Sequence, residues 1–114
     1  MDNMGVGLQE ELIADLTTEL KNDEAFDLEI LTAKVVGAIR EVKLMRNYGA
    51  TSYTDKQIQE DLYNYYSIIK RVALYDYNQI GVEGQVSHNE NSTNRTWEDR
   101  SKLFNGVHAF VNFF

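Results

Sequence analysis

Apolar side chains recur at helical intervals through the first two thirds of the chain, and this periodicity limits the possible fold more than any other feature. Between Leu8 and Leu20, leucines are spaced four residues apart, which places them along one face of an α-helix. Apolar residues return at helical spacing over Leu28–Arg46 and again over Ile58–Ala73. The sequence therefore predicts a mostly α-helical protein.

Capping residues give the expected bounds of the helices. Asp27 precedes the second apolar stripe and can cap that helix, and Gly49 is the expected left-handed residue after its end. Thr54 is followed three residues later by Gln57, which matches a capping box, and the helix that starts there is expected to reach about Ile80. Because the link between these two helices is short, we expect a small antiparallel bundle of three main helices.

The sequence changes character after residue 80. Gly81-Val82-Glu83-Gly84 is expected to end the helix, and in the stretch that follows only Val86 is apolar. Such a stretch buries too little apolar area to offset about 1–2 kcal/mol of backbone entropy per ordered residue, so alone it should be mobile. Its Asn, Ser and Thr residues suit a protruding polar β-hairpin whose open edges a neighbouring copy could complete. The residues assigned to this contact between copies are Gln85, Val86, Ser87, His88, Asn89, Glu90, Asn91, Ser92, Thr93, Asn94, Arg95 and Thr96.

The C-terminal end is rich in aromatic residues. The apolar residues over 107–114 fit one face of a helix or one face of a strand, and eight residues are too few to decide between the two. An apolar end must be covered in water, either by the protein's own core or by another chain. We expect this segment to dock on a partner through Trp97, Phe104, Phe110, Phe113 and Phe114.

The length and composition indicate a single domain. The chain has 114 residues, of which 43% are hydrophobic and 25% charged, which suits one modest core. Within that domain we distinguish a helical body with an acidic N-terminal arm (1–80), the polar hairpin (81–97) and a C-terminal docking segment (98–114). The absence of cysteine excludes a disulfide framework, a zinc ribbon and a thiol nucleophile.

The net charge of -7 is unevenly distributed. The first 30 residues contain nine acidic residues and one basic residue, Lys21, and so carry -8, whereas the other 84 residues sum to +1. This balance disfavours capture of nucleic acid by a basic surface. The acidic arm either faces a basic partner or keeps the protein in solution. No membrane span or export signal is recognisable, so we expect a soluble protein that is not exported and has no membrane partner.

The sequence offers little for catalysis or metal binding. Glu11, Asp15 and Glu19 form an i, i+4 row, which should diverge into solvent as a hydrated face rather than converge on a cation. His88 and His108 have no Glu or His at ligand spacing, and no serine lies in a nucleophile elbow. We therefore expect no enzyme, no catalytic residues, no metal and no cofactor.

From the third helix onward the sequence shows, in order, a Tyr-rich helix, a Gly-x-Glu-Gly exit and a polar segment that closes on an aromatic residue. These features lie in Asp61–Ile69, Ala73–Asn78, Gly81–Gln85, Ser87–Asn91 and Arg95–Trp97. By the order of these features the chain resembles the head-tail connector (adaptor) family of tailed bacteriophages and prophages, over about residues 25–100. The chain departs from the family pattern at Tyr48-Gly49, where Tyr-Pro is expected.

The resemblance implies a structural protein of the virion neck, present in the host cytoplasm during assembly. Copies of such a protein form a ring, commonly of twelve subunits, that docks beneath the portal protein and contacts the next neck or tail-completion protein. DNA passes through the lumen without specific binding during packaging and ejection, and residues 85–96 would line that lumen. The alternative function is a small cytoplasmic helical regulator that binds a protein partner through its acidic first helix.

Overall fold

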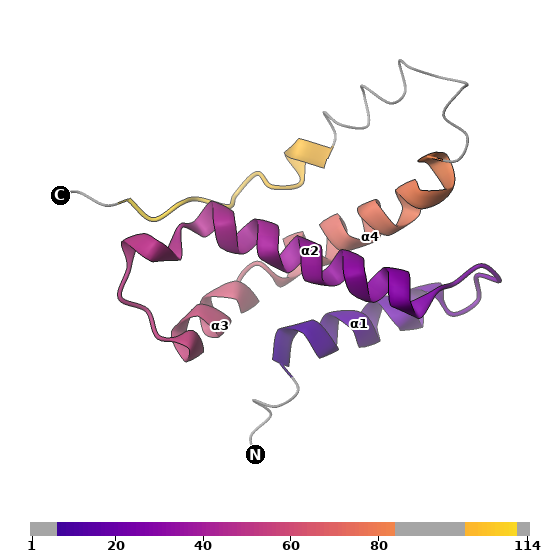
Figure 1. Ribbon diagram of the computed structural model, residues 1–114, viewed down its shortest axis with the longest axis horizontal. Coiled ribbons are helices and arrows are strands. Elements are labelled where there is room, and N and C mark those ends of the chain that lie inside the picture. The colour runs from indigo at the N-terminus through magenta and orange to yellow at the C-terminus, as the bar shows by residue number, and fades with distance from the viewer. Residues whose placement is uncertain (1–6, 84–99, 112–114) are drawn as a thin grey trace.

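The computed structural model describes residues 7–83 and 100–111, and helices dominate the first of these parts (Figure 1). The prediction of a mostly α-helical protein is confirmed, and no strand occurs in these two ranges. The elements are α1 (Gly7–Leu20), α2 (Leu28–Arg46), the 3-10 helix η2 (Tyr48–Ala50), α3 (Asp55–Tyr63) and α4 (Tyr66–Glu83). Residues 100–102 add one helical turn, and the chain then follows the outer side of α2.

The prediction of a single third helix is wrong, because α3 and α4 are separate. The break falls at Asn64 and Tyr65, where the Asn64 N–H donates to the Asp61 carbonyl at 3.0 Å and the Tyr65 N–H donates to the Leu62 carbonyl at 2.9 Å. These bonds to the third preceding residue tighten the turn and redirect the chain. Apolar spacing continues through the break, so periodicity alone could not reveal it.

The predicted β-hairpin must also be corrected. Gly81–Glu83, which were expected to end the helix and open the hairpin, belong to α4. A glycine inside a helix costs only about 1 kcal/mol relative to alanine, which the rest of a long helix can offset. The body is thus an all-helical arrangement in the described ranges, and the rest of the hairpin assignment, Gln85–Thr96, lies outside them.

The predicted N-terminal caps of α2 and α3 are confirmed. The Asp27 carboxylate accepts a hydrogen bond from the Ile30 N–H at 3.2 Å, and Thr54 and Gln57 form a reciprocal capping box. The left-handed residue after α2 is Asn47, with φ 59°, rather than Gly49. Asparagine tolerates this conformation because its short amide can bond nearby backbone groups.

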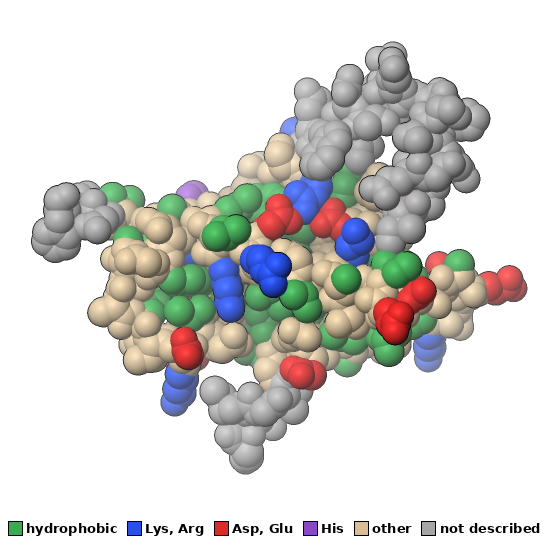
Figure 2. Space-filling model, in the orientation of Figure 1, with side chains coloured by type: hydrophobic (Ala, Val, Ile, Leu, Met, Phe, Trp, Pro, Cys, Tyr) green, Lys and Arg blue, Asp and Glu red, His purple; other side chains and the backbone are tan. Residues whose placement is uncertain are grey.

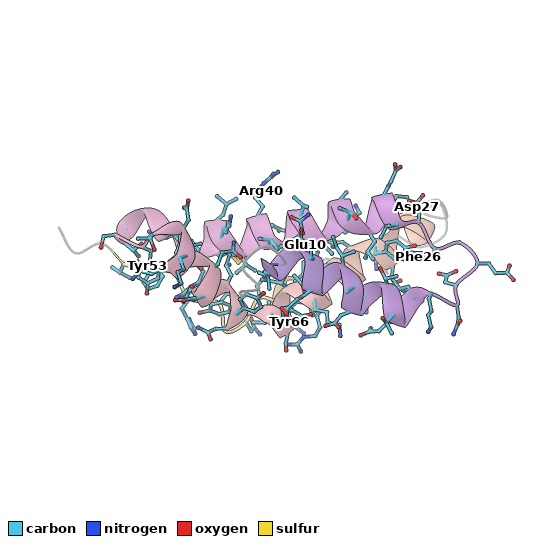
Figure 3. All side chains as sticks on the ribbon, turned by 90° about the horizontal axis from the view of Figure 1, so that it is seen from below. Glu10, Phe26, Asp27, Arg40, Tyr53 and Tyr66 are labelled. Atoms are coloured by element: carbon cyan, nitrogen blue, oxygen red, sulfur yellow. The ribbon has the colours of Figure 1, made fainter. Side chains whose placement is uncertain are left out.

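The core lies between α1, α2 and α4, and the closest association is between α2 and α4. The molecule is flat, with extents of 48 × 38 × 17 Å, and its short dimension fits about two layers of helices. In Figure 3, α2 forms the upper layer, with α1 and α3 beneath it. The buried apolar residues are Leu8, Leu12, Leu16, Leu31, Val35, Ala38, Val42, Leu62, Ile69, Val72, Ala73, Tyr77 and Phe104.

Tyr77 ties α4 to the start of α2, and its hydroxyl gives a first prediction. The Asp27 N–H donates to the Tyr77 hydroxyl at 2.9 Å, and the tyrosine ring packs on Phe26. We expect Tyr77→Phe to lower the free energy of unfolding, measured by urea denaturation, by about 1–2 kcal/mol. The substitution leaves the part-buried N–H group of Asp27 without this hydrogen-bond acceptor. The control Tyr53→Phe also removes a tyrosine hydroxyl, but from a side chain that is 38% exposed, and it should change stability by less than about 0.5 kcal/mol. Equal losses in both variants would contradict this role.

Candidate functional site

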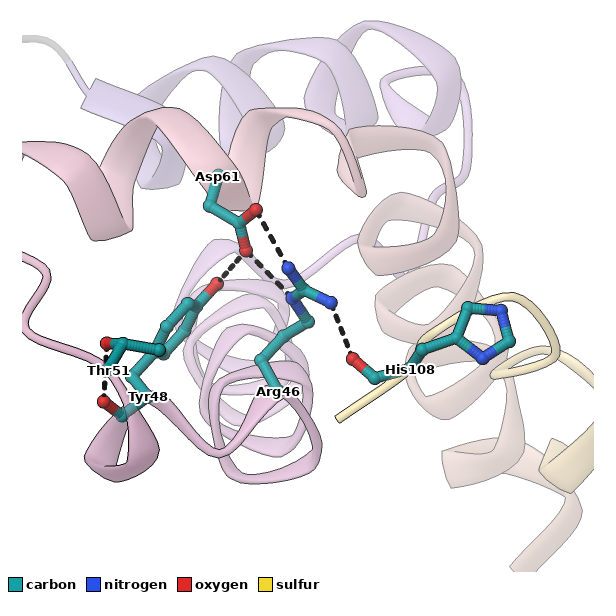
Figure 4. A network of polar contacts seen from close by, with 5 residues as sticks. All are labelled: Arg46, Tyr48, Thr51, Asp61 and His108. Carbon is teal, nitrogen blue, oxygen red and sulfur yellow. Dashed lines mark hydrogen bonds and ion pairs between the residues drawn. The ribbon is translucent and has the colours of Figure 1, made fainter. Parts of the chain in front are cut away.

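The C-terminal part of the chain is fastened to the bundle by two arginines, and the first of them is Arg46 (Figure 4). Arg46 is the last residue of α2 and is only 8% exposed. Its Nε and Nη2 donate to the two Asp61 carboxylate oxygens at 2.8 and 3.0 Å, and its Nη1 donates to the His108 carbonyl at 2.5 Å. The Tyr48 hydroxyl also donates to Asp61, at 2.5 Å. A bidentate, charge-assisted pair of this kind fixes both orientation and distance.

Aromatic rings enclose the Arg46 guanidinium from both sides. Its Cζ lies 4.9 Å from the centre of the Tyr65 ring and 4.1 Å from that of Phe110. Tyr48 and Tyr53 pack against Phe110 in turn. The rings shield the ion pair from water, and cation–π attraction adds to its stability.

Backbone bonds complete the attachment of residues 107–111. The Phe110 N–H donates to the Arg46 carbonyl at 2.9 Å, and the Asn47 side-chain amide donates to the Phe110 carbonyl at 3.1 Å. Residues 107–111 form neither a helix nor a strand. Their conformation is therefore set by contacts with the end of α2 rather than by a regular backbone pattern.

The ionisation of the Arg46 site follows from its geometry. Burial acts to raise the pKa of Asp61, but hydrogen bonds from Arg46 and Tyr48, with the positive charge of Arg46, outweigh it and hold the pKa below its ordinary value of 3.8. Burial, reinforced by the bond to the Asp61 carboxylate, raises the pKa of Tyr48. Asp61 is thus ionised and Tyr48 neutral near neutral pH, which is the pairing that the hydrogen bonds require.

Arg100 forms the second attachment. Its guanidinium binds both oxygens of Asp76 on α4, at 2.7 and 2.8 Å, and both oxygens of Glu41 on α2, at 3.2 and 2.5 Å. The hydrogen bonds that Arg100 donates, to Asp76 first and then to Glu41, raise the pKa of Arg100. Phe104, a few residues further along, enters the core with its ring centre 5.4 Å from the guanidinium.

Two of the residues expected to dock on a partner thus pack within their own chain instead. Phe104 is 8% exposed in the core, and Phe110 covers Arg46. For these two rings the cover is the protein itself, one of the two options that the sequence left open. Trp97, Phe113 and Phe114 lie outside the described residues, as does the assigned segment Gln85–Thr96.

The acidic row on α1, which was expected to be a hydrated face, is exposed, and it also lies along the junction with α4. The Tyr66 hydroxyl donates to the Asp15 carboxylate and to the Glu11 carbonyl, and Lys70 Nζ lies 2.5 Å from Glu19 Oε2. Burial first, and then the bond to Asp15, raises the pKa of Tyr66. The sequence holds a signal for this match, because Tyr66 and Lys70 repeat the i, i+4 spacing of Asp15 and Glu19.

An open cleft lies where α2, η2 and α3 meet. It has a volume of about 650 Å³ and borders Leu44, which is 74% exposed. Its lining residues are Lys43, Leu44, Asn47, Tyr48, Gly49, Asp55, Ile58 and Gln59. Within residues 7–83 and 100–111 no group of three acidic or histidine side chains could hold a metal ion, and no helix there is long and apolar enough to cross a membrane.

No family model, curated protein or solved structure matches the chain. The resemblance to head-tail connectors therefore stays a prediction from the sequence.

Proposed function

We propose that the protein is a structural subunit of a head-tail connector ring in a tailed phage or prophage. In this role, copies of the chain form a ring beneath the portal protein, and the next neck or tail-completion protein binds to the opposite side. The DNA passes through the ring without specific binding. The protein acts by position and rigidity and carries out no chemical step.

One observation carries this proposal: two of the stretches that resemble the connector family form part of the framework of the fold. Asp61–Ile69 and Ala73–Asn78 supply buried residues from α3 and α4. They also supply the carboxylates of Asp61 and Asp76, which hold the two arginines. The resemblance thus falls on residues that determine how the helices and the C-terminal part pack. These are the residues that two proteins with the same fold are expected to share.

The charge balance supports passage of DNA without strong binding. A protein that neutralises phosphates with Lys and Arg releases counterions and holds nucleic acid tightly. This chain has a net charge of -7, and its body has a nearly balanced charge apart from the first 30 residues. A ring of such subunits offers the DNA little electrostatic attraction, which keeps resistance to movement low.

The function is tested by purifying the full chain alone and with the portal protein encoded in the same genome. We expect native mass spectrometry to find one closed oligomer bound to the portal, and electron microscopy to show a ring at its tail-facing end. Particles made without the chain should fill with DNA and fail to bind tails. A chain that stays monomeric with the portal, together with normal particles in its absence, would refute the proposal.

The alternative, a cytoplasmic regulator that binds through its first helix, has less support. Three of the four leucines of α1 are buried, at 0–2% exposure, and so form part of the core. Asp15 and Glu19 are bonded to α4. A partner that bound this helix would have to displace both sets of contacts.

A further inference from the structure

The surface around α2 separates charge along its length. The connection between α1 and α2 carries Asp23 and Glu24, and Glu29 lies in the first turn of α2; all three are exposed, and Lys21 is the basic residue of the connection. Toward the other end of the helix, Arg40 and Lys43 are exposed. Figure 2 shows acidic side chains at the end where α1 meets α2, and Lys and Arg side chains over the middle of the face, where some acidic side chains also lie.

The two basic side chains have no acidic partner in the described part of their own chain. The ion pairs there involve Arg46, Lys70 and Arg100, and neither Arg40 nor Lys43 takes part. In Figure 3, Arg40 projects from α2 away from the rest of the molecule. The Arg40–Leu44 surface is therefore a charged face with no counterpart among the residues that surround it.

Each charged region also exposes a leucine. Leu28, at the acidic end, is 51% exposed, and Leu44, beside Lys43, is 74% exposed and borders the open cleft. We call Asp23, Glu24, Leu28 and Glu29 the acidic corner, and Arg40, Lys43 and Leu44, with the adjoining cleft, the basic face. Charged groups around an apolar contact are the usual composition of a protein interface.

We propose that the basic face of one copy binds the acidic corner of the next copy. This inference rests on the proposed function and names the contact by which the ring forms. Opposite charges would meet at the rim, which favours encounter and correct orientation. Leu28 would enter the cleft beside Leu44, so that both apolar side chains lose contact with water.

The positions of the two regions allow the head-to-tail arrangement that the proposed ring requires. They lie toward opposite ends of α2, a helix of 19 residues that is about 28 Å long. In that arrangement, one contact between two copies leaves a free basic face on one and a free acidic corner on the other. Such an interface adds further copies until the ring closes.

The test uses two charge-reversed full-length chains. The first carries Glu24→Lys and Glu29→Lys, and the second carries Arg40→Glu and Lys43→Glu; circular dichroism verifies that both fold. In sedimentation and native mass spectrometry, with and without the portal protein, we expect each to self-associate at least about tenfold more weakly than the unmodified chain. Mixing the two should restore oligomers that contain them in equal numbers. A matched control, Glu10→Lys with Glu60→Lys, makes the same change of charge elsewhere and should assemble normally.

The outcomes separate this contact from the proposed function. Rings that form equally well from either charge-reversed chain would overturn the contact and leave the connector role standing. An unmodified chain that forms no oligomer, even with the portal, would overturn both. Assemblies no larger than a dimer would overturn the head-to-tail arrangement, and a basic-face variant that loses only portal binding would assign that face to the portal instead.

Discussion

Replacing Asp61 with asparagine is expected to lower the free energy of unfolding by roughly 2–4 kcal/mol. The substitution keeps the size of the side chain but removes the charge that balances Arg46, which is 8% exposed and held between two rings. A guanidinium in that position retains its charge and loses its counterion, so the cost exceeds that of one neutral hydrogen bond. Urea denaturation followed by circular dichroism measures the loss.

A double-mutant cycle shows whether the loss arises from the pair. Arg46→Met removes the charge itself, so the double variant should lose less than the sum of the two single variants, by about 1–3 kcal/mol. Glu60→Gln, on the exposed side of the same helix, is the matched control and should stay within about 0.5 kcal/mol of the unmodified protein. Strictly additive losses would show that Asp61 and Arg46 act independently.

The pH dependence of the same variant follows from the lowered pKa of Asp61. A carboxyl group whose pKa is lower in the folded state stabilises the protein above its ordinary pKa, here 3.8, and that contribution is lost as the pH falls through the folded-state value. The difference in stability between the unmodified protein and Asp61→Asn should therefore be constant near neutral pH and shrink below about pH 4. A difference that persisted unchanged to about pH 2 would mean that ionisation of Asp61 does not contribute.

Arg100→Met is expected to release residues 100–107 from the bundle. The variant leaves the carboxylates of Glu41 and Asp76 side by side without a cation, so the two helices lose their shared contact with the C-terminal part. Hydrogen exchange followed by mass spectrometry should show at least about tenfold faster exchange at the Leu103 and Phe104 amides. These amides donate to the carbonyls of Arg100 and Ser101, so they report directly on this segment.

The control for Arg100 is an exposed arginine on α4. Among the described residues, Arg71 donates only to the Ser67 carbonyl of its own helix, so Arg71→Met should leave exchange in residues 100–107 unchanged. Hydrogen exchange in α1 should be the same in both variants, because no hydrogen bond or ion pair among the described residues joins α1 to Arg100. Unaltered exchange at Leu103 and Phe104 in Arg100→Met would show that apolar packing of Phe104 alone holds the segment.

Local features of the sequence were sufficient for α1 and α2 and for the caps. Leucine spacing identified the buried face of α1, and the Asp27 and Thr54 caps depend only on residues within one turn. The break between α3 and α4 was missed because Leu62 and Ile69 continue one helical pattern across it. The same reliance on local pattern assigned Gly81 to a turn, although α4 continues through it.

The polar contacts of the candidate site were beyond the reach of local pattern. Arg46 meets His108 across 62 positions of sequence, and Arg100 meets Glu41 across 59. Arg46, Glu41 and Arg100, taken alone, are ordinary helix residues, and His108 contributes only its backbone carbonyl. Only the packing of α2 against α4 and the return of the C-terminal part bring them together, so spacing along the chain carries no trace of the pairs.

The Arg46 guanidinium makes a bidentate contact with Asp61 while it packs on aromatic rings, and this combination restricts which sequences can adopt this fold. A lysine would keep the positive charge, but its ammonium group is not planar. It could not donate to both Asp61 oxygens and the His108 carbonyl while packed against the two rings. In diverged relatives we therefore expect Arg46 and Asp61 either both to be retained or both to be replaced together. That covariation would let distant members of the same lineage be aligned where overall identity has been lost.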